Sequence, residues 1–356
     1  MNILDRYLAR TVLLYTGLVM AVLMSLGALF VFIEQQDEIG VGSYTAASAF
    51  LYCLMSMPEQ VFELLPIGAL LGSLIGLGLL ARSSEIIAVR AAGVSLARMT
   101  LAVGAAGVLL ALASVLIGEF VAPPVQQFAR QFKLFSKYAD LSEAGGGSVW
   151  VKDGGSMVQL ERQAGGAVFG GVYVFRFADP GHLASIARAT TASVAGDGRW
   201  ELDGYAETAF TAQGGTRVTR SPRQSFPTSV SPEFVGLAAE DPGRMPTLRL
   251  AQYLAHLRAN GLDTRAVEFA LWARIARTVS IAVVVLLALP FSFGSMRTAG
   301  SGARTVVGVL IGIGFYLLQR TLESSAQVFN VNPILLAWTP VTLLVAGTAF
   351  ALRRTR

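Results

Sequence analysis

The sequence is short of charge, of histidine and of cysteine, and each shortage narrows the possibilities. Charged residues make up 14% of the 356-residue chain, against roughly 25% in a soluble domain, whereas hydrophobic residues make up 53%. Cys53 is the single cysteine and excludes an internal disulfide, so any part outside a membrane must be held by its own core. Together with the mean hydropathy of +0.57, this predicts an integral membrane protein.

Six segments are apolar enough to cross a bilayer, which takes a helix of about 20 residues. The first is too long for the apolar part of a signal peptide and has no small-residue cleavage site, so we expect it to remain as an anchor. The predicted fold is an α-helical polytopic membrane protein with six transmembrane helices in a 3+3 arrangement, divided into residues 1–122, 123–267 and 268–356. The six segments are 11–33, 61–81, 99–118, 278–296, 305–322 and 333–352.

The arginines of the short loops all fall on one side of the predicted membrane. The opposite loops, 34–44 and 323–332, contain acids and no basic residue. Because Lys and Arg accumulate in cytoplasmic loops, both termini are predicted to be cytoplasmic and the insert to lie outside. The ten arginines are Arg6, Arg10, Arg82, Arg90, Arg98, Arg297, Arg304, Arg353, Arg354 and Arg356.

The insert has a different character from the spans. Its sequence alternates in SVWVKDGGSMVQLER, and turn residues recur every 8 to 15 positions, which predicts an all-β domain at about 145–235. A helix over 246–261, ended by Gly261, is expected to lead to the fourth span. Between residues 124 and 250 there are 13 Lys and Arg against 12 Asp and Glu. The basic excess thus belongs to the cytoplasmic loops, and nucleic-acid binding has no support.

No motif for catalysis, nucleotides or metals stands out. The pattern GxxxxGK[ST] is absent, and Gly68, Gly72 and Gly76 recur every fourth residue inside a span, a spacing that favours close helix packing. Neither His182 nor His256 has a second ligand at metal-binding spacing. The sequence predicts a non-enzymatic chain with no metal site and no cofactor of its own.

Charged residues beside the spans are functional candidates, because charge is costly there. Arg130, Lys133 and Lys137 follow the third span at positions that share one helical face. Snorkelling to lipid headgroups, or for Arg320 a local pair with Glu323, is one interpretation. The other is a basic rim that receives an anionic amphiphile bearing phosphate. Further arginines at the outer ends of later spans are Arg274, Arg277 and Arg320.

The polar stretch ARSSEIIAVRAAG between the second and third spans predicts a short helix at about 84–93. A serine can cap its start, Glu85 lies in the first turn where the helix dipole favours an anion, and Gly93 suits the position after its end. Glu85, Val89 and Ala92 then share one face. A plain turn would tolerate this stripe, whereas a helix that docks in a groove of another protein would use it.

Segments along the whole chain resemble the LptF/LptG permease family, the membrane subunits of the lipopolysaccharide export ABC transporter of Gram-negative bacteria. GVGSY and FSFGSMR favour the LptG type over the LptF type. The matching segments are LDRYLART, GVGSY, SMPEQVFELLPIGALLGSLIGLGLLARSSEIIAVRAAG, LALPFSFGSMR, GIGFYLL and NPILLAWTP.

The resemblance implies an inner-membrane permease that extracts lipopolysaccharide and drives it towards the outer membrane through a periplasmic bridge. It implies a β-jellyroll for the insert and three protein partners: an LptF-type paralogue, an LptB-type ATPase dimer that carries ATP and magnesium, and an LptC-type single-span protein. In the family a glutamate of the coupling helix meets the ATPase groove, and Glu85 stands at the matching position.

One family feature does not transfer. Family members have basic residues for the substrate's phosphates at the outer end of the first span, where this chain has Glu34, Asp37 and Glu38. The basic pair after the third span does match, at Arg130 and Lys133, so phosphate contact is expected there, with Lys137 and Arg320 as further candidates.

The lateral gate, beside which the LptC helix lies, is expected around the end of the first span. Its residues are Phe30, Ile33, Glu34 and Asp37. The acids at 34–38 could also act through divalent cations that bridge phosphates. Three alternatives remain: an LptF-type subunit, a membrane-anchored periplasmic scaffold or sensor without a transport cycle, and a MacB-like permease, which six spans disfavour.

Overall fold

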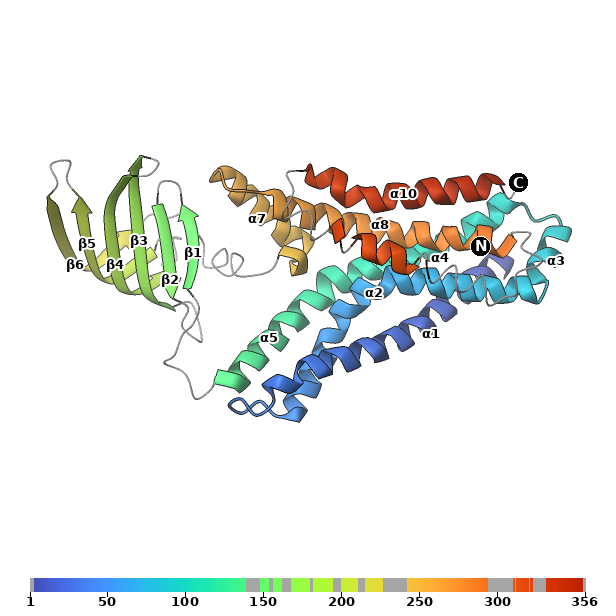
Figure 1. Cartoon of the computed structure of the whole chain (residues 1–356), viewed down its shortest axis with the longest axis horizontal. Coiled ribbons are helices and arrows are strands. Elements are labelled where there is room, and N and C mark those ends of the chain that lie inside the picture. The colour runs from blue at the N-terminus through green and yellow to red at the C-terminus, as the bar shows by residue number, and fades with distance from the viewer. Residues whose placement is uncertain are drawn as a thin grey trace. The chain divides into compact units, whose positions relative to one another are not determined.

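The computed structural model describes residues 3–138, 148–153, 156–161, 168–179, 182–194, 200–210, 215–226, 242–293, 310, 312–319, 321–322 and 331–354. The chain forms two compact units. The helical unit comprises residues 1–139, 246–250 and 265–356, and the β unit comprises residues 140–245 and 251–264. Figure 1 shows their elements.

The described helices confirm a polytopic membrane fold. Five are long and apolar enough to span a bilayer, and the predicted fifth span, 305–322, is described only in part, at residues 310, 312–319 and 321–322, all of them helical. Most of the helices are longer than the apolar segments predicted from the sequence, because the polar residues at their ends continue the helical backbone hydrogen bonding. They are α1 (Ile3–Glu34), η1 (Gln36–Glu38), α2 (Ala46–Arg82), α3 (Glu85–Ala91), α4 (Leu96–Leu116), the π-helix η2 (Ile117–Val121), α5 (Ala122–Tyr138), η3 (Pro242–Arg244), α7 (Thr247–Ala259), α8 (Arg265–Phe293) and α10 (Pro333–Arg354).

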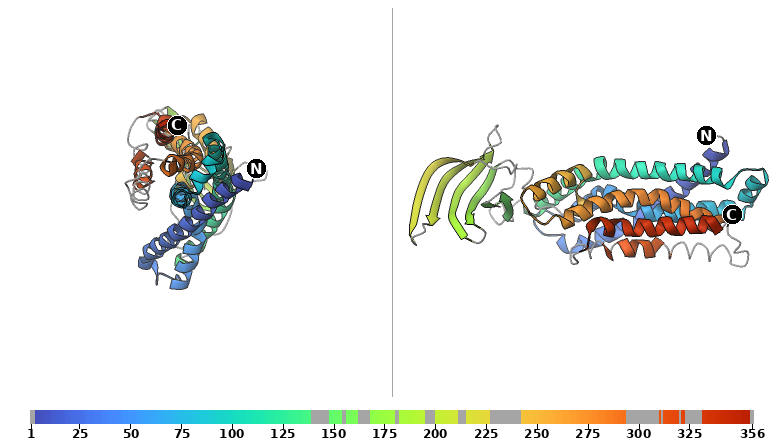
Figure 2. Two further views of the ribbon diagram at one scale, coloured as in Figure 1. Left: turned by 90° about the vertical axis from the view of Figure 1, so that its right-hand side faces the viewer. Right: turned by 90° about the horizontal axis from the view of Figure 1, so that it is seen from above.

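Helices α1, α2, α4 and α8 enclose the core of the helical unit, which includes the fully buried Leu70, Leu77 and Ile281. The glycines of α2 allow α1 to approach closely, as their spacing predicts. A Cβ at Gly72 would overlap the backbone of Thr16 on α1. Both termini and α3 lie at one end of this unit in the two perpendicular views (Figures 1 and 2).

Between residues 148 and 226 the described elements of the insert are all strands, as the alternating pattern predicts. The described strands pair only with their sequence neighbours, in an antiparallel sheet of order β1 to β6. A jelly roll would also pair strands distant in sequence, and among the described strands the connectivity is instead that of a meander. The strands are β1 (Ser148–Asp153), β2 (Ser156–Glu161), β3 (Val168–Asp179), β4 (His182–Val194), β5 (Trp200–Phe210) and β6 (Thr216–Phe226).

One face of this sheet carries the core of the β unit, which includes Val174, Trp200 and Leu202. Beside it, the Glu207 carboxylate accepts hydrogen bonds from Arg176 Nη1 at 2.9 Å and from Tyr205 Oη at 2.8 Å. Burial raises the pKa of Glu207, but the hydrogen bonds from neighbouring side chains and the Arg176 charge outweigh it and lower the pKa below its ordinary value.

Candidate functional site

Helix α3 is a short helix with a well-defined end. The N–H of Gly93 donates to Arg90 O at 3.0 Å and that of Val94 to Val89 O at 3.3 Å. This pair of bonds is the Schellman motif, and Gly93 supplies the positive φ, 85°, that the motif requires. Ser84 precedes the helix in a left-handed conformation, with φ 61°, and its side chain makes no cap bond. The predicted stop at Gly93 is therefore confirmed, but serine does not cap the start.

Glu85 is held in place by two hydroxyl groups. Tyr7 Oη of α1 donates to Glu85 Oε2 at 2.7 Å, and Ser83 Oγ donates to Oε1 at 2.9 Å. These hydrogen bonds, that of Tyr7 first, lower the pKa of Glu85 because they stabilise its charged form. The carboxylate thus stays ionised and oriented at the surface, and it is linked to the first turns of α1.

The predicted stripe of α3 is divided between the core and the surface. Val89 is half-buried and packs against the core of the helical unit beside the buried Ile86. Ala92 is exposed, and Ile87 is 64% exposed on the outward side. The exposed surface of α3 therefore includes Ile87, the alanines and Glu85. Val89 packs on the opposite side, against the core of the helical unit.

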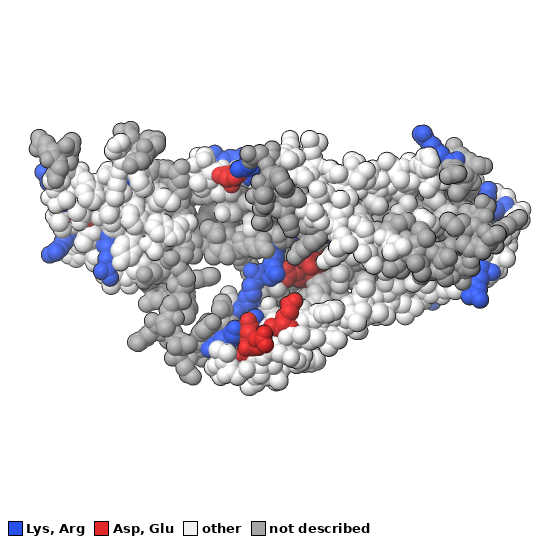
Figure 3. All heavy atoms as spheres, viewed as in Figure 1, with Lys and Arg blue, Asp and Glu red and all other residues white. Residues whose placement is uncertain are grey.

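The two lysines of α5 are paired with an acid. Glu38 Oε2 lies 2.5 Å from Lys133 Nζ and 3.1 Å from Lys137 Nζ. Lys133 Nζ also lies 4.9 Å from the centre of the Tyr52 ring. Arg130 is half-buried, and its Nε has no hydrogen-bond partner among the described residues. We call Glu38, Arg130, Lys133 and Lys137 the α5 cluster; acidic and basic side chains gather near the ends of α5 and α1 in Figure 3.

The four predicted gate residues are exposed, three at the C-terminal end of α1 and Asp37 in η1. Phe30 is 64% exposed and Ile33 48%, and both Glu34 and Asp37 are exposed. Of the residues in the most apolar stretch of this first span, only 17% are buried against the rest of the chain. This flank is therefore left for lipid or for another protein. Glu38, in contrast, is engaged by the lysines, which weighs against its holding a divalent cation.

A buried ion pair joins α8 to the π-helix. Arg274 Nε donates to Glu119 Oε1 at 2.6 Å, and the side chains of Arg274 and Glu119 are 8% and 19% exposed. Thr247 at the start of α7 donates its N–H and its hydroxyl to the same carboxylate, each at 2.7 Å. Arg274 also donates to Gly118 O and lies 4.4 Å from the centre of the Phe62 ring. The interpretation that Arg274 snorkels to headgroups or joins a free rim is therefore wrong.

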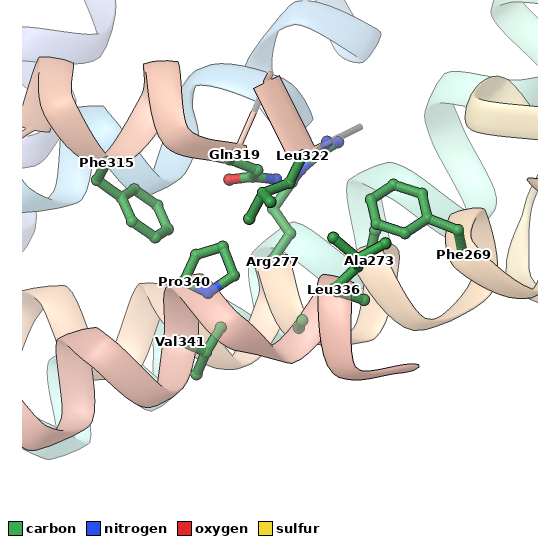
Figure 4. Close-up of a pocket in the computed structure, with 11 residues that line it drawn as sticks. Phe269, Ala273, Arg277, Phe315, Gln319, Leu322, Leu336, Pro340 and Val341 are labelled. Carbon is green, nitrogen blue, oxygen red and sulfur yellow. The ribbon is translucent and has the colours of Figure 1, made fainter. Parts of the chain in front are cut away.

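Arg277, one turn further along α8, lines a small pocket with apolar walls. When the Gln319 amide is oriented with its oxygen towards Arg277, this oxygen accepts hydrogen bonds from Arg277 Nε at 2.9 Å and from Arg277 Nη2 at 3.2 Å. Phe269, Phe315 and Pro340 contribute to the walls, and Figure 4 shows them around the pocket. Its volume of about 10 Å³ is that of about one water molecule, too small for a lipid chain.

Comparison with known proteins decides the family. The model of the family described as lipopolysaccharide export system permease LptF/LptG matches residues 6–354. The chain belongs to the LptF/LptG permease family. The lipopolysaccharide export system permease protein LptG of Escherichia coli K12 is 31% identical over 340 residues, which are 95% of this chain and 94% of that protein. LptG of Haemophilus influenzae is 31% identical over 361 residues, 100% and 99% of the two chains.

Within the LptF/LptG family, these relatives make the chain an LptG-type permease, as the GVGSY and FSFGSMR segments predict. Of the residues predicted for the substrate, Arg130, Lys133 and Lys137 lie on α5, and Arg320 lies outside the described residues. The sequence interpretation missed Tyr7 and Glu119 and did not assign Glu38 to the lysines. Glu119 directly follows the uncharged third span. Because a charge beside a span usually has a partner, its position could have predicted a buried ion pair.

Proposed function

We propose that this permease is the LptG-type half of an ATP-driven exporter that extracts lipopolysaccharide from the inner membrane and passes it to a periplasmic bridge. The family match over residues 6–354 carries this proposal. The proposed orientation follows the arginine-rich loops, with both termini and α3 in the cytoplasm and the β unit in the periplasm. This chain binds no nucleotide itself; ATP and magnesium belong to a separate ATPase dimer of the LptB type.

The contact with that ATPase is proposed to be α3. Its exposed Ile87 and small neighbours can enter an apolar groove, and Glu85 adds a charge that Tyr7 and Ser83 hold in one place. A preorganised charge loses less freedom on binding than a mobile one. Since Tyr7 belongs to α1, movement of the docked α3 would be transmitted to α1, the helix that carries the gate residues.

The proposed substrate contacts are Arg130, Lys133 and Lys137, whose positive charges suit the phosphates of lipopolysaccharide. The exposed flank of α1 at Phe30 and Ile33 is proposed to border the gate and to receive the LptC-type helix and the LptF-type paralogue. Glu34 and Asp37 would lie at its edge.

Copurification tests the assembly. Glu85→Arg should abolish copurification of the ATPase and ATP-driven release of lipopolysaccharide from proteoliposomes. Glu201→Arg, the same charge reversal in the β unit, should leave copurification unchanged. If Glu85→Arg still retains the ATPase, α3 is not the docking element. A wild-type chain that copurifies no ATPase under the same conditions would instead point to a non-transporting scaffold.

A further inference from the structure

The loop between α1 and α2 is fastened to the last turn of α5. Ser43 donates both its N–H and its hydroxyl to Ser136 O, each at 2.8 Å. Gly42, with φ 59°, lies so close to the carbonyl of Lys137 that a Cβ there would overlap it. The loop thereby supplies hydrogen-bond donors to α5 at a helix end, where carbonyl groups lack partners within the helix.

The loop itself is a preformed support. Tyr44 is fully buried, and its hydroxyl donates to Gln35 Oε1 at 3.3 Å. The N–H of Gly40 donates to Tyr44 O at 2.9 Å. Glu38, within η1, is therefore carried on a folded segment and not on a free chain, so its position relative to α5 is defined.

The lysines that Glu38 meets are largely withdrawn from solvent. The side chains of Lys133 and Lys137 are 20% and 13% exposed, whereas that of Glu38 is 31% exposed. Charges in such surroundings interact more strongly than in open water. A single carboxylate cannot neutralise two ammonium groups and the neighbouring Arg130, so the α5 cluster retains an excess of positive charge.

We infer that Glu38 is an internal substitute for a phosphate group: it occupies the α5 cluster in the closed state, and a phosphate-bearing amphiphile displaces it and releases the end of α1 from α5. This inference rests on the proposed function. A phosphate has more charge than a carboxylate and three acceptor oxygens. It can therefore satisfy Lys133, Lys137 and the unpartnered Nε of Arg130 together.

The exchange gives the substrate different affinities for two states, which is what a ligand needs in order to shift a conformational equilibrium. Before displacement, Glu38 and the Ser43–Ser136 bonds hold the loop against α5. After displacement, the partly exposed Glu38 returns to water, and the loop is held to α5 only by the neutral serine bonds, which break when the loop moves away. The end of α1, with the predicted gate residues Phe30 and Ile33, is then less restrained.

The first test compares Glu38→Gln with Glu63→Gln, the same substitution at an exposed position of α2 outside the cluster. The permease complex in nanodiscs is titrated with diphosphoryl lipid A and with a dephosphorylated analogue. Glu38→Gln should tighten binding of the phosphorylated probe roughly five- to tenfold, the lower part of the usual range for coupled sites. Binding of the dephosphorylated analogue should not change, and Glu63→Gln should alter neither.

The outcomes separate this inference from the proposed function. If the double variant Lys133→Gln/Lys137→Gln binds the phosphorylated probe as the wild type does, the lysines are not substrate contacts and the proposed site fails. If that variant binds more weakly but Glu38→Gln shows unchanged or weaker binding, the substrate site stands and displacement of Glu38 is wrong.

A disulfide gives a second, independent test of release. In a Cys53→Ala background, the substitutions Ser43→Cys and Ser136→Cys should allow a disulfide to form under oxidation and lock the loop to α5. Locked complexes should still contain the ATPase but export lipopolysaccharide at least tenfold more slowly, with recovery on reduction. Undiminished export by the fully crosslinked complex would overturn the inference.

Discussion

The network around Glu119 allows a quantitative prediction. Replacing Glu119 by Ala removes the acceptor for Arg274 Nε and for both donors of Thr247. The Arg274 side chain is only 8% exposed, so its charge would remain buried with the Gly118 carbonyl and the Phe62 ring as its known remaining partners. Loss of one partner of a buried ion pair costs about 3–5 kcal/mol. We expect this loss for Glu119→Ala, and a similar one for Arg274→Ala.

The comparison with a double variant shows how the pair contributes. Glu119→Leu combined with Arg274→Met removes both charges and fills the space with apolar groups, a change that is often neutral for a buried pair. Thr247 would still lose its acceptor, at a cost of about 1 kcal/mol. The double variant should therefore be less damaged than either alanine variant.

Equilibrium unfolding of the purified chain in mixed detergent and SDS micelles can measure these differences. The variants should unfold at a lower midpoint SDS fraction, and the helical content of the folded state should not change. A loss below about 1 kcal/mol for both alanine variants would refute the view that Arg274 depends on Glu119. A double variant as unstable as the sum of the single ones would show that the two residues act independently.

Three further predictions concern other parts of the chain. Gly72→Ala should force α1 away from α2 and lower the thermal stability and yield of the folded chain, whereas Gly78→Ala, with no neighbour within 4 Å of the added Cβ, should not. Tyr7→Phe should raise the pKa of Glu85 towards its ordinary value, so that copurification of the ATPase is lost at a higher pH than in the wild type as the pH is lowered. The lowered pKa of Glu207 stabilises the β unit fully above about pH 4.3, and this contribution is lost as the pH falls through the folded-state value. In Glu207→Gln, the free energy of unfolding of the β unit should therefore fall less steeply with decreasing pH in the acid range than in the wild type. Unfolding followed by tryptophan fluorescence at several pH values measures this.

The class of the protein and the limits of its elements follow from local patterns. A run such as 333–352 must be a helix in a bilayer, because an unpaired backbone is too costly there. Gly93 ends α3 because the Schellman motif needs a positive φ, which glycine adopts without steric cost. Alternation of apolar and polar residues predicts strands, because successive side chains in a strand point to opposite faces of the sheet. Each of these signals is contained within a few neighbouring residues.

The pairing of charges was decided only by the tertiary structure. Glu119 and Arg274 are 155 residues apart, and Tyr7 and Glu85 are 78 apart. No local pattern states which arginine or acid will be brought alongside another once the helices pack. For this reason the sequence suggested that Lys133 and Lys137 form an open basic rim, whereas the fold places the Glu38 carboxylate between them. The sequence by itself determined a membrane permease with a short polar helix that carries Glu85 and stops at Gly93. Packing determined which of its charges are already satisfied, because an ion pair depends on distance in space and not along the chain.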